Sequence, residues 1–151
     1  MSEKIKANFS FQSLFWLVLI LSIDALIFYF SSQPGAKSAS QSGFVLNYFQ
    51  IVDSLTTQKI IRKLAHFSIY ACMGLCWTNF LRTLNLSLRH CFWISILMCF
   101  LFAAGDEWHQ TFVPGRSGEL FDVCLDTFGA ILATSCTLWL HTHFFKTNNA
   151  Q

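Results

Sequence analysis

The sequence predicts an all-α integral membrane bundle of about four transmembrane helices, with a short interfacial amphipathic helix. Of the 151 residues, 54% are hydrophobic, 17% aromatic and only 12% charged, whereas roughly a quarter of the residues of soluble domains are charged. Four apolar runs are long enough to enter a bilayer. Because lipid offers the backbone no hydrogen-bond partner, each run is expected to be helical. We expect residues 1–151 to form a single domain.

Charge and cysteine usage exclude two other classes of protein. Ten Lys and Arg against eight Asp and Glu give a net charge of +2, which is too little for nucleic-acid binding without a basic patch. All six cysteines fall inside apolar runs, whereas a secreted disulfide framework places cysteines in polar loops. We therefore expect no nucleic-acid partner and interpret the cysteines as small apolar residues.

The first apolar run, residues 14–30, follows Lys4 and Lys6. A cleaved signal peptide is the alternative to a transmembrane helix here. The run is longer than a usual signal core and carries Asp24 near its middle, so it predicts an uncleaved transmembrane helix.

The segment after this run is predicted to contain a loop and then a surface helix. Residues 31–43 hold Pro34, Gly35 and five serines, which favours a loop. Residues 42–55 then place apolar side chains at helical spacing. The stripe consists of Phe44, Tyr48, Ile51, Val52 and Leu55. A short helix with one apolar stripe is expected to lie flat at the membrane surface.

The remaining runs cover residues 64–81, 91–105 and 120–145. A bilayer core needs about 20 helical residues, so the middle run spans only if flanking residues 84–90 or 106–110 extend the helix. We expect Thr57 to cap the first of these helices near Gln58, and the last helix to begin near Ser117.

The predicted orientation in the membrane depends on whether the cations of the candidate site are included in the count of Lys and Arg on each side. Four spans put both termini on one side, where five cations lie: Lys4, Lys6, Arg82, Arg89 and Lys146. The other side also has five: Lys37, Lys59, Arg62, Lys63 and Arg116. Three of the latter, Arg62, Lys63 and Arg116, accompany carboxylates, and discounting them places both termini in the cytoplasm. The expected location is the inner cell membrane.

Ionisable residues inside the spans are the most informative feature. A charge at mid-bilayer costs roughly 2.5–3.5 kcal/mol, so such groups are expected to face the bundle interior and to be partnered. Asp24, His66 and Asp126 should lie about 10–14 Å below the same membrane face, given 1.5 Å rise per residue. Further charged residues lie where the helices meet that face: Arg62, Lys63, Asp106, Glu107, Arg116, Glu119 and Asp122. Gly129 and Ala133 should let a neighbouring helix approach closely.

The charges of this group do not balance. Three cations and five carboxylates, counting Asp126, leave −2 if all are ionised. Either some carboxyl groups are protonated, or a divalent cation binds. The chain has no HExxH, HxH or Cys-x-x-Cys near the site, so the sequence does not choose between them.

One string of residues resembles a known family signature. Residues 106–116 read Asp-Glu-Trp-His-Gln-Thr-Phe-Val-Pro-Gly-Arg, and Asp122 follows. Residues 31–33, and Lys63-x-x-His66 with Tyr70, resemble shorter motifs of the same family. Over about residues 14–140 the chain is similar to the VanZ-like membrane proteins.

The resemblance implies a small multi-pass bacterial envelope protein, in a family associated with low-level resistance to the glycopeptide teicoplanin. It implies functional roles for Lys63, His66, Asp106, Glu107, Gln110, Arg116 and Asp122. It implies none for Asp126, where asparagine is common in the family. An association with an antibiotic does not identify a reaction.

The first candidate function is a membrane enzyme or lipid-modifying protein acting at the outward face. The residues expected to bind an anionic group of a lipid-linked substrate are Arg62, Lys63, Gln110, Arg116 and Asp122. The expected general acids or bases are Glu107, Asp106 and His66. No nucleophile motif such as G-x-S-x-G fixes a reaction, so the sequence leaves open whether this is an enzyme.

Two alternatives remain. A non-catalytic envelope protein would bind a lipid, a cell-wall precursor or a partner protein with the same residues. A proton-coupled carrier would use Asp24, Asp126 and His66, because buried ionisable groups mark such pathways. Four short helices leave little room for alternating access unless the chain oligomerises.

Overall fold

The computed structural model describes residues 10–52 and 54–144, and these form five helices and no strand. The helices are α1 (Phe11–Ser31), α2 (Gly35–Tyr48), α3 (Leu55–Thr83), α4 (Leu88–Gln110) and α5 (Leu120–Phe144). The all-α prediction is confirmed. The chain termini, with Lys4, Lys6 and Lys146 of the orientation count, lie outside the described residues.

Three of the described helices, α1, α4 and α5, are long and apolar enough to cross a membrane. Helix α4 begins at Leu88 and ends at Gln110, so flanking residues extend the third apolar run at both ends. Helix α3 is longer, with 29 residues, but it carries more polar side chains and is not among the three.

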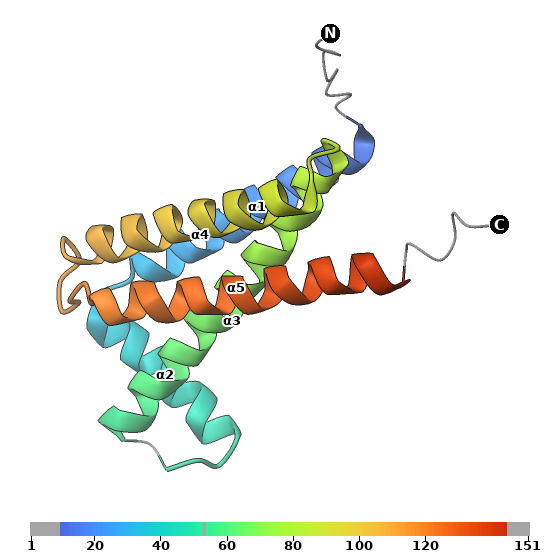
Figure 1. Cartoon of the computed structure of the whole chain (residues 1–151). Coiled ribbons are helices and arrows are strands. Elements are labelled where there is room, and N and C mark those ends of the chain that lie inside the picture. The colour runs from blue at the N-terminus through green and yellow to red at the C-terminus, as the bar shows by residue number, and fades with distance from the viewer. Residues whose placement is uncertain (1–9, 53, 145–151) are drawn as a thin grey trace, which may run out of the picture.

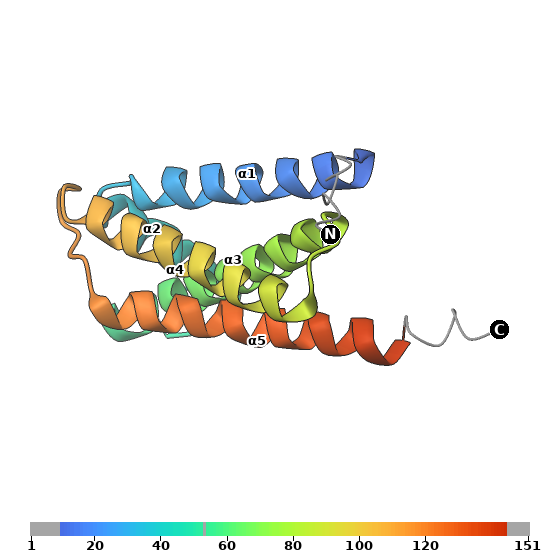
Figure 2. The ribbon, with the colours of Figure 1, turned by 45° about the horizontal axis from the view of Figure 1, so that its top comes forward.

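Helix α3 is the centre of the bundle. It contacts each of the other four helices, and Figures 1 and 2 show it crossing obliquely behind α4 and α5. The core around it consists of small and apolar side chains, including Tyr70, Met73, Cys99 and Ala130. In both views α1 and α4 end where α5 begins. The loops that follow α1 and α4 therefore share one end of the bundle.

Two glycines let α3 and α5 approach closely. A Cβ atom on Gly129 would lie 2.6 Å from the carbonyl oxygen of Phe67, and one on Gly74 would lie 2.8 Å from that of Ala130. These distances are too short for any side chain, so the two helices pack backbone against backbone at these positions. The expectation for Gly129 is confirmed.

The predicted loop at residues 31–43 is wrong from residue 35 onward, and the helix predicted at residues 42–55 is displaced, because α2 begins at Gly35 and ends at Tyr48. Two of its three serines are small packing residues: Ser38 and Ser42 are buried, and the Ser42 hydroxyl donates to the carbonyl of Ser38. A serine that bonds back to the preceding turn is compatible with a helix. The helix stops before residue 55 because Gln50 adopts a positive φ of 55°.

Two predicted helix starts are also wrong. Ser54, not Thr57, caps α3, and Thr57 completes the capping box three residues later. Helix α5 starts at Leu120 rather than near Ser117. Gly118 explains the delay, since a Cβ there would lie 2.5 Å from the carbonyl oxygen of Glu107. The chain before α5 thus lies against the end of α4 and turns helical only after leaving it.

Candidate functional site

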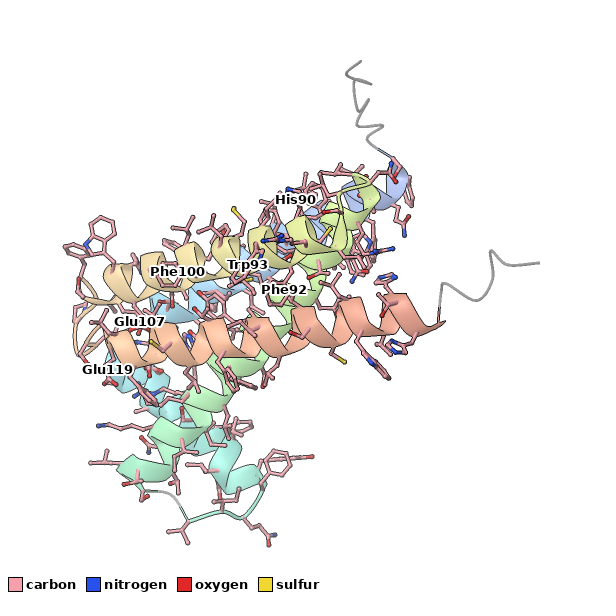
Figure 3. All side chains as sticks on the ribbon, in the orientation of Figure 1. His90, Phe92, Trp93, Phe100, Glu107 and Glu119 are labelled. Carbon is pink, nitrogen blue, oxygen red and sulfur yellow. The ribbon has the colours of Figure 1, made fainter. Side chains whose placement is uncertain are left out.

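A polar cavity of about 250 Å³ lies at the shared end of α4 and α5 and is bounded on one side by the first half of α3. Figure 3 shows Glu107 and Glu119 together at this end, with His90 at the opposite end of α4. Seven of the eight predicted site residues line the cavity: Arg62, Lys63, His66, Glu107, Gln110, Arg116 and Asp122. The eighth, Asp106, lies immediately behind it and accepts a hydrogen bond from Gln110.

Sequence reasoning gave no site role to three lining residues, Lys59, Gly115 and Ser117, and it placed a fourth, Glu119, in the charged group at this face without assigning it a role. Lys59 could have been found, because it shares a helix face with Lys63 and His66, at i+4 and i+7. Ser117, near which the last helix was expected to begin, belongs to the loop before α5.

Gln110 joins the acidic and basic sides of the cavity. Its side-chain amide nitrogen donates to Asp106 and to Glu107, both at 2.9 Å, and its amide oxygen accepts from Arg116 at 3.1 Å. The other oxygen of Glu107 accepts from the backbone N–H of Glu119 at 2.8 Å. Asp106, Glu107 and Gln110 are buried, so these bonds satisfy groups that have little access to water.

Arg116 ties the loop between α4 and α5 to the end of α1. Its guanidinium donates to the carbonyl of Phe30 at 2.9 Å and to that of Gln33 at 3.1 Å. The last carbonyls of a helix have no α-helical donor; that of Phe30 accepts from the backbone N–H of Gln33 at 3.3 Å and also from Arg116. Burial lowers the pKa of Arg116, and the nearby Arg62 lowers it further, while Asp106 and Glu107 oppose the shift. An arginine nevertheless stays charged.

Lys63 forms ion pairs with two carboxylates. Its ammonium group pairs with Glu119 at 3.1 Å and with Asp122, and it lies 5.2 Å from the centre of the Phe121 ring. Within residues 10–52 and 54–144, no carboxylate lies at ion-pair distance from Arg62 or Lys59. Arg116 also lacks an ion pair but donates hydrogen bonds to protein oxygens, so among the described cations that line the cavity Arg62 and Lys59 are the two available to a ligand.

Of the three buried ionisable groups expected near one depth, His66 and Asp126 lie together, whereas Asp24 borders a different cavity. His66 of α3 points its Nδ1 atom at α4 and α5, 4.0 Å from Asp106 and 3.6 Å from Asp126. Asp24 of α1 is not part of the polar cavity. It lines a larger, mainly apolar cavity of about 510 Å³ between α1 and α4.

Comparison with known families identifies the chain. A family model described as VanZ/LLP1 matches residues 14–141. The chain belongs to the VanZ/LLP1 family. The resemblance deduced from residues 106–116 is confirmed, and those residues form the end of α4 and the loop that lines the cavity. No curated protein and no solved structure matches the chain. Family and apolar helices together make it a membrane protein.

Among the described residues of this VanZ/LLP1 protein, no group of three or more His, Cys, Asp or Glu is arranged to hold a metal ion. The acidic groups instead bond to neighbours: Glu107 to Gln110 and a backbone N–H, and Asp122 to Lys63. Internal hydrogen bonds and ion pairs therefore account for most of the carboxylates that suggested a cation.

A second cavity, of about 230 Å³, adjoins the polar one in this VanZ/LLP1 protein. It lies between the end of α1, the buried face of α2 and the first half of α3. Its apolar wall is formed by Phe30, Val45, Ile61 and Ala65. The two cavities share three lining residues: Arg62, His66 and Arg116. Polar and apolar compartments thus meet at a wall of cationic and imidazole side chains.

Proposed function

We propose that this VanZ/LLP1 protein binds, and acts on, an anionic lipid-linked component of the cell envelope at the outward face of the inner membrane. The observation that carries the proposal is the shared wall between the two cavities. A ligand with an anionic group at Arg62 would have polar space on one side and apolar space on the other. That division matches an amphiphile such as a polyprenyl phosphate.

Arg62 is the proposed anchor of the anionic group. Among the described residues it has no ion-pair partner, and its charge is close enough to Arg116 to lower the pKa of that group. Two neighbouring guanidinium groups repel each other, and a bound anion would offset that repulsion. A guanidinium also offers a planar fork that fits phosphate or carboxylate. Lys59 lines the same cavity as a further cation.

The remaining binding residues have a supporting role in this proposal. Lys63, Gln110, Arg116 and Asp122 bond to protein partners, and they shape the cavity through those bonds. Of the three proposed acid–base groups, His66 has an exposed edge that lines both cavities, whereas both oxygens of Glu107 accept internal hydrogen bonds. His66 is therefore the best placed of the three to exchange a proton with a ligand.

The same proposal includes four membrane-spanning helices. Helix α3 would be the fourth span, with its charged first turns at the interface and its apolar second half in the core. Helix α2 would lie on the membrane surface, supported by Phe44 and Tyr48, which are 74% and 75% exposed. Aromatic and apolar side chains on a surface helix favour insertion at the headgroup level. Both termini would then be cytoplasmic.

We expect Arg62→Gln to weaken binding of polyprenyl phosphate at least about tenfold, since a hydrogen bond to a charged group contributes about 1.5–3 kcal/mol. Binding is measured by native mass spectrometry of protein in nanodiscs. Arg89→Gln, an exposed arginine at the other end of α4, is the matched control and should bind normally. Equal binding by both variants would contradict the proposal.

A second variant tests the apolar compartment. Ala65→Phe would fill part of the cavity beside α2. It should weaken binding of the long-chain phosphate while leaving a short, water-soluble isoprenyl phosphate unaffected. Equal loss of both ligands would assign the effect to the polar cavity and contradict a hydrocarbon site.

Topology is tested by labelling single cysteines in a background from which the six native cysteines have been removed. Positions in residues 37–58 and 112–118 should react with a membrane-impermeant reagent added outside, and positions in residues 83–89 should not. Labelling of residues 83–89 from outside would reverse the orientation and move the site to the cytoplasm.

A further inference from the structure

The buried side of the cavity contains a histidine and a carboxylate that lack hydrogen-bond partners. Asp126 is 1% exposed, and within the described residues neither of its oxygens has a partner. The Nδ1 atom of His66 is likewise buried without a hydrogen bond. The two groups face each other, with 3.6 Å between His66 Nδ1 and an oxygen of Asp126.

A buried histidine and carboxylate that make no hydrogen bond destabilise the folded protein, so a bond between them is favoured. A buried polar group without a partner destabilises the fold by about 1–3 kcal/mol, and a charged one by more. Because 3.6 Å exceeds a hydrogen-bond distance, a small side-chain rotation is needed to close the contact. Hydrogen bonds around catalytic groups are often long before a ligand binds.

Asp126 is a better acceptor for His66 than its neighbour Asp106. The Asp106 oxygen lies farther away, at 4.0 Å, and it already accepts from Gln110 at 2.9 Å. The other charged groups nearby also have partners: Glu107 bonds to Gln110, and Lys63 pairs with Asp122. Asp126 therefore has both the shorter distance and the unused lone pairs.

We propose that Asp126 is a positioning residue for His66: it accepts a hydrogen bond from Nδ1–H and so leaves Nε2 as the basic nitrogen on the cavity side, beside Arg62. The hydrogen bond made by one ring nitrogen decides which nitrogen carries the proton. Nε2 can then take a proton from a water or hydroxyl group in the cavity, and Asp126 stabilises the imidazolium that forms. This assignment deepens the proposed function and rests on it for its chemical purpose.

The arrangement differs from a structural salt bridge in one measurable respect. A buried ion pair requires only that opposite charges be close, whereas a positioning carboxylate fixes the tautomer of the neutral ring. Replacing the aspartate of a histidine–aspartate pair by asparagine keeps the shape but reverses the tautomer, because the amide can donate to Nδ1.

The experiment is nitrogen NMR of protein labelled with ¹⁵N-histidine in nanodiscs, at a pH where the ring is neutral. His66→Gln identifies the signal of His66 among the five histidines. The wild-type protein should contain the Nδ1–H tautomer, Asp126→Asn the Nε2–H tautomer, and Asp126→Glu should restore the first. Asp122→Asn, one turn earlier on α5 and paired with Lys63 instead, is the matched control and should leave the tautomer unchanged.

Two results would overturn the assignment: an Nε2–H tautomer in the wild-type protein, or an Nδ1–H tautomer that persists in folded Asp126→Asn. If Asp126→Asn does not fold, the wild-type and Asp126→Glu spectra still decide the question. The readout needs no ligand, so it is independent of the binding assays. An Nδ1–H tautomer in a protein that binds no polyprenyl phosphate would support the pair while contradicting the proposed function.

Discussion

Gln110→Glu is expected to be the most destabilising isosteric change in the protein. The side chain is 5% exposed, and its nitrogen donates to both Asp106 and Glu107. A carboxylate at this position would turn two hydrogen bonds into contacts between like charges. The expected loss is about 3–5 kcal/mol, as for a buried charge left without its partner. Thermal unfolding in detergent and the yield of folded protein measure it.

Gln33→Glu is the matched control for this change. Gln33 makes the same kind of side-chain hydrogen bond, to the carbonyl of Tyr29, but at an exposed position. It should alter stability by no more than about 0.5 kcal/mol. The loss of stability in Gln110→Glu, relative to the wild-type protein, should become smaller as the pH falls, because a protonated carboxyl group can donate a hydrogen bond. Similar stability of the two variants at neutral pH would contradict the central role of Gln110.

Gly35→Ala is expected to separate α2 from the loop that follows α4. A Cβ atom on Gly35 would lie 2.1 Å from the carbonyl oxygen of Gly115, and the backbone N–H of Gly35 donates to Pro114 at 3.0 Å. Backbone cannot yield as a flexible side chain can, so the loop must move. Overpacking of this kind destabilises by about 1–3 kcal/mol. Polyprenyl phosphate binding should fall as well, because Gly115 lines the polar cavity.

Gly105→Ala tests the same chemical change where space is available. No heavy atom lies within 4 Å of the added Cβ, and alanine is the better helix former by about 1 kcal/mol. This variant should be as stable as the wild-type protein or more so. If Gly35→Ala matched it in thermal stability and in ligand binding, the close contact between residues 35 and 115 would have no importance for the fold.

Hydrophobic runs predicted the long helices well, because a membrane demands apolar length and leaves little choice of conformation. The short α2 shows where such reasoning fails. Its serines, Pro34 and Gly35 have the composition of a loop, but Ser38 and Ser42 are buried against the bundle. Composition reports the average preference of a residue, while burial by another helix decides the outcome when the local preference is weak.

The sequence predicted which residues line the site, but it did not predict their hydrogen-bond partners. Helical spacing and the position of charges at helix ends identified seven of the lining residues, including Glu107 and Arg116. The partners were not predictable, because Arg116 bonds to backbone carbonyls more than 80 residues earlier in the chain. Nothing in a side-chain pattern identifies a carbonyl as an acceptor. Lys63 and Arg116 line the cavity, and their cationic groups also bond to protein partners that the side-chain pattern did not identify.

The bonds from Arg116 to Phe30 and Gln33 also constrain the order in which the molecule can be completed during synthesis. The carbonyl of Phe30 accepts from the backbone N–H of Gln33 within the first segment, but the bonds from Arg116 to Phe30 and Gln33 can form only after the loop that follows the third apolar run has been made. The two cavities therefore cannot exist in a nascent chain that ends before residue 116. Insertion into the bilayer can proceed segment by segment, but the site can close only after residue 116 has been made.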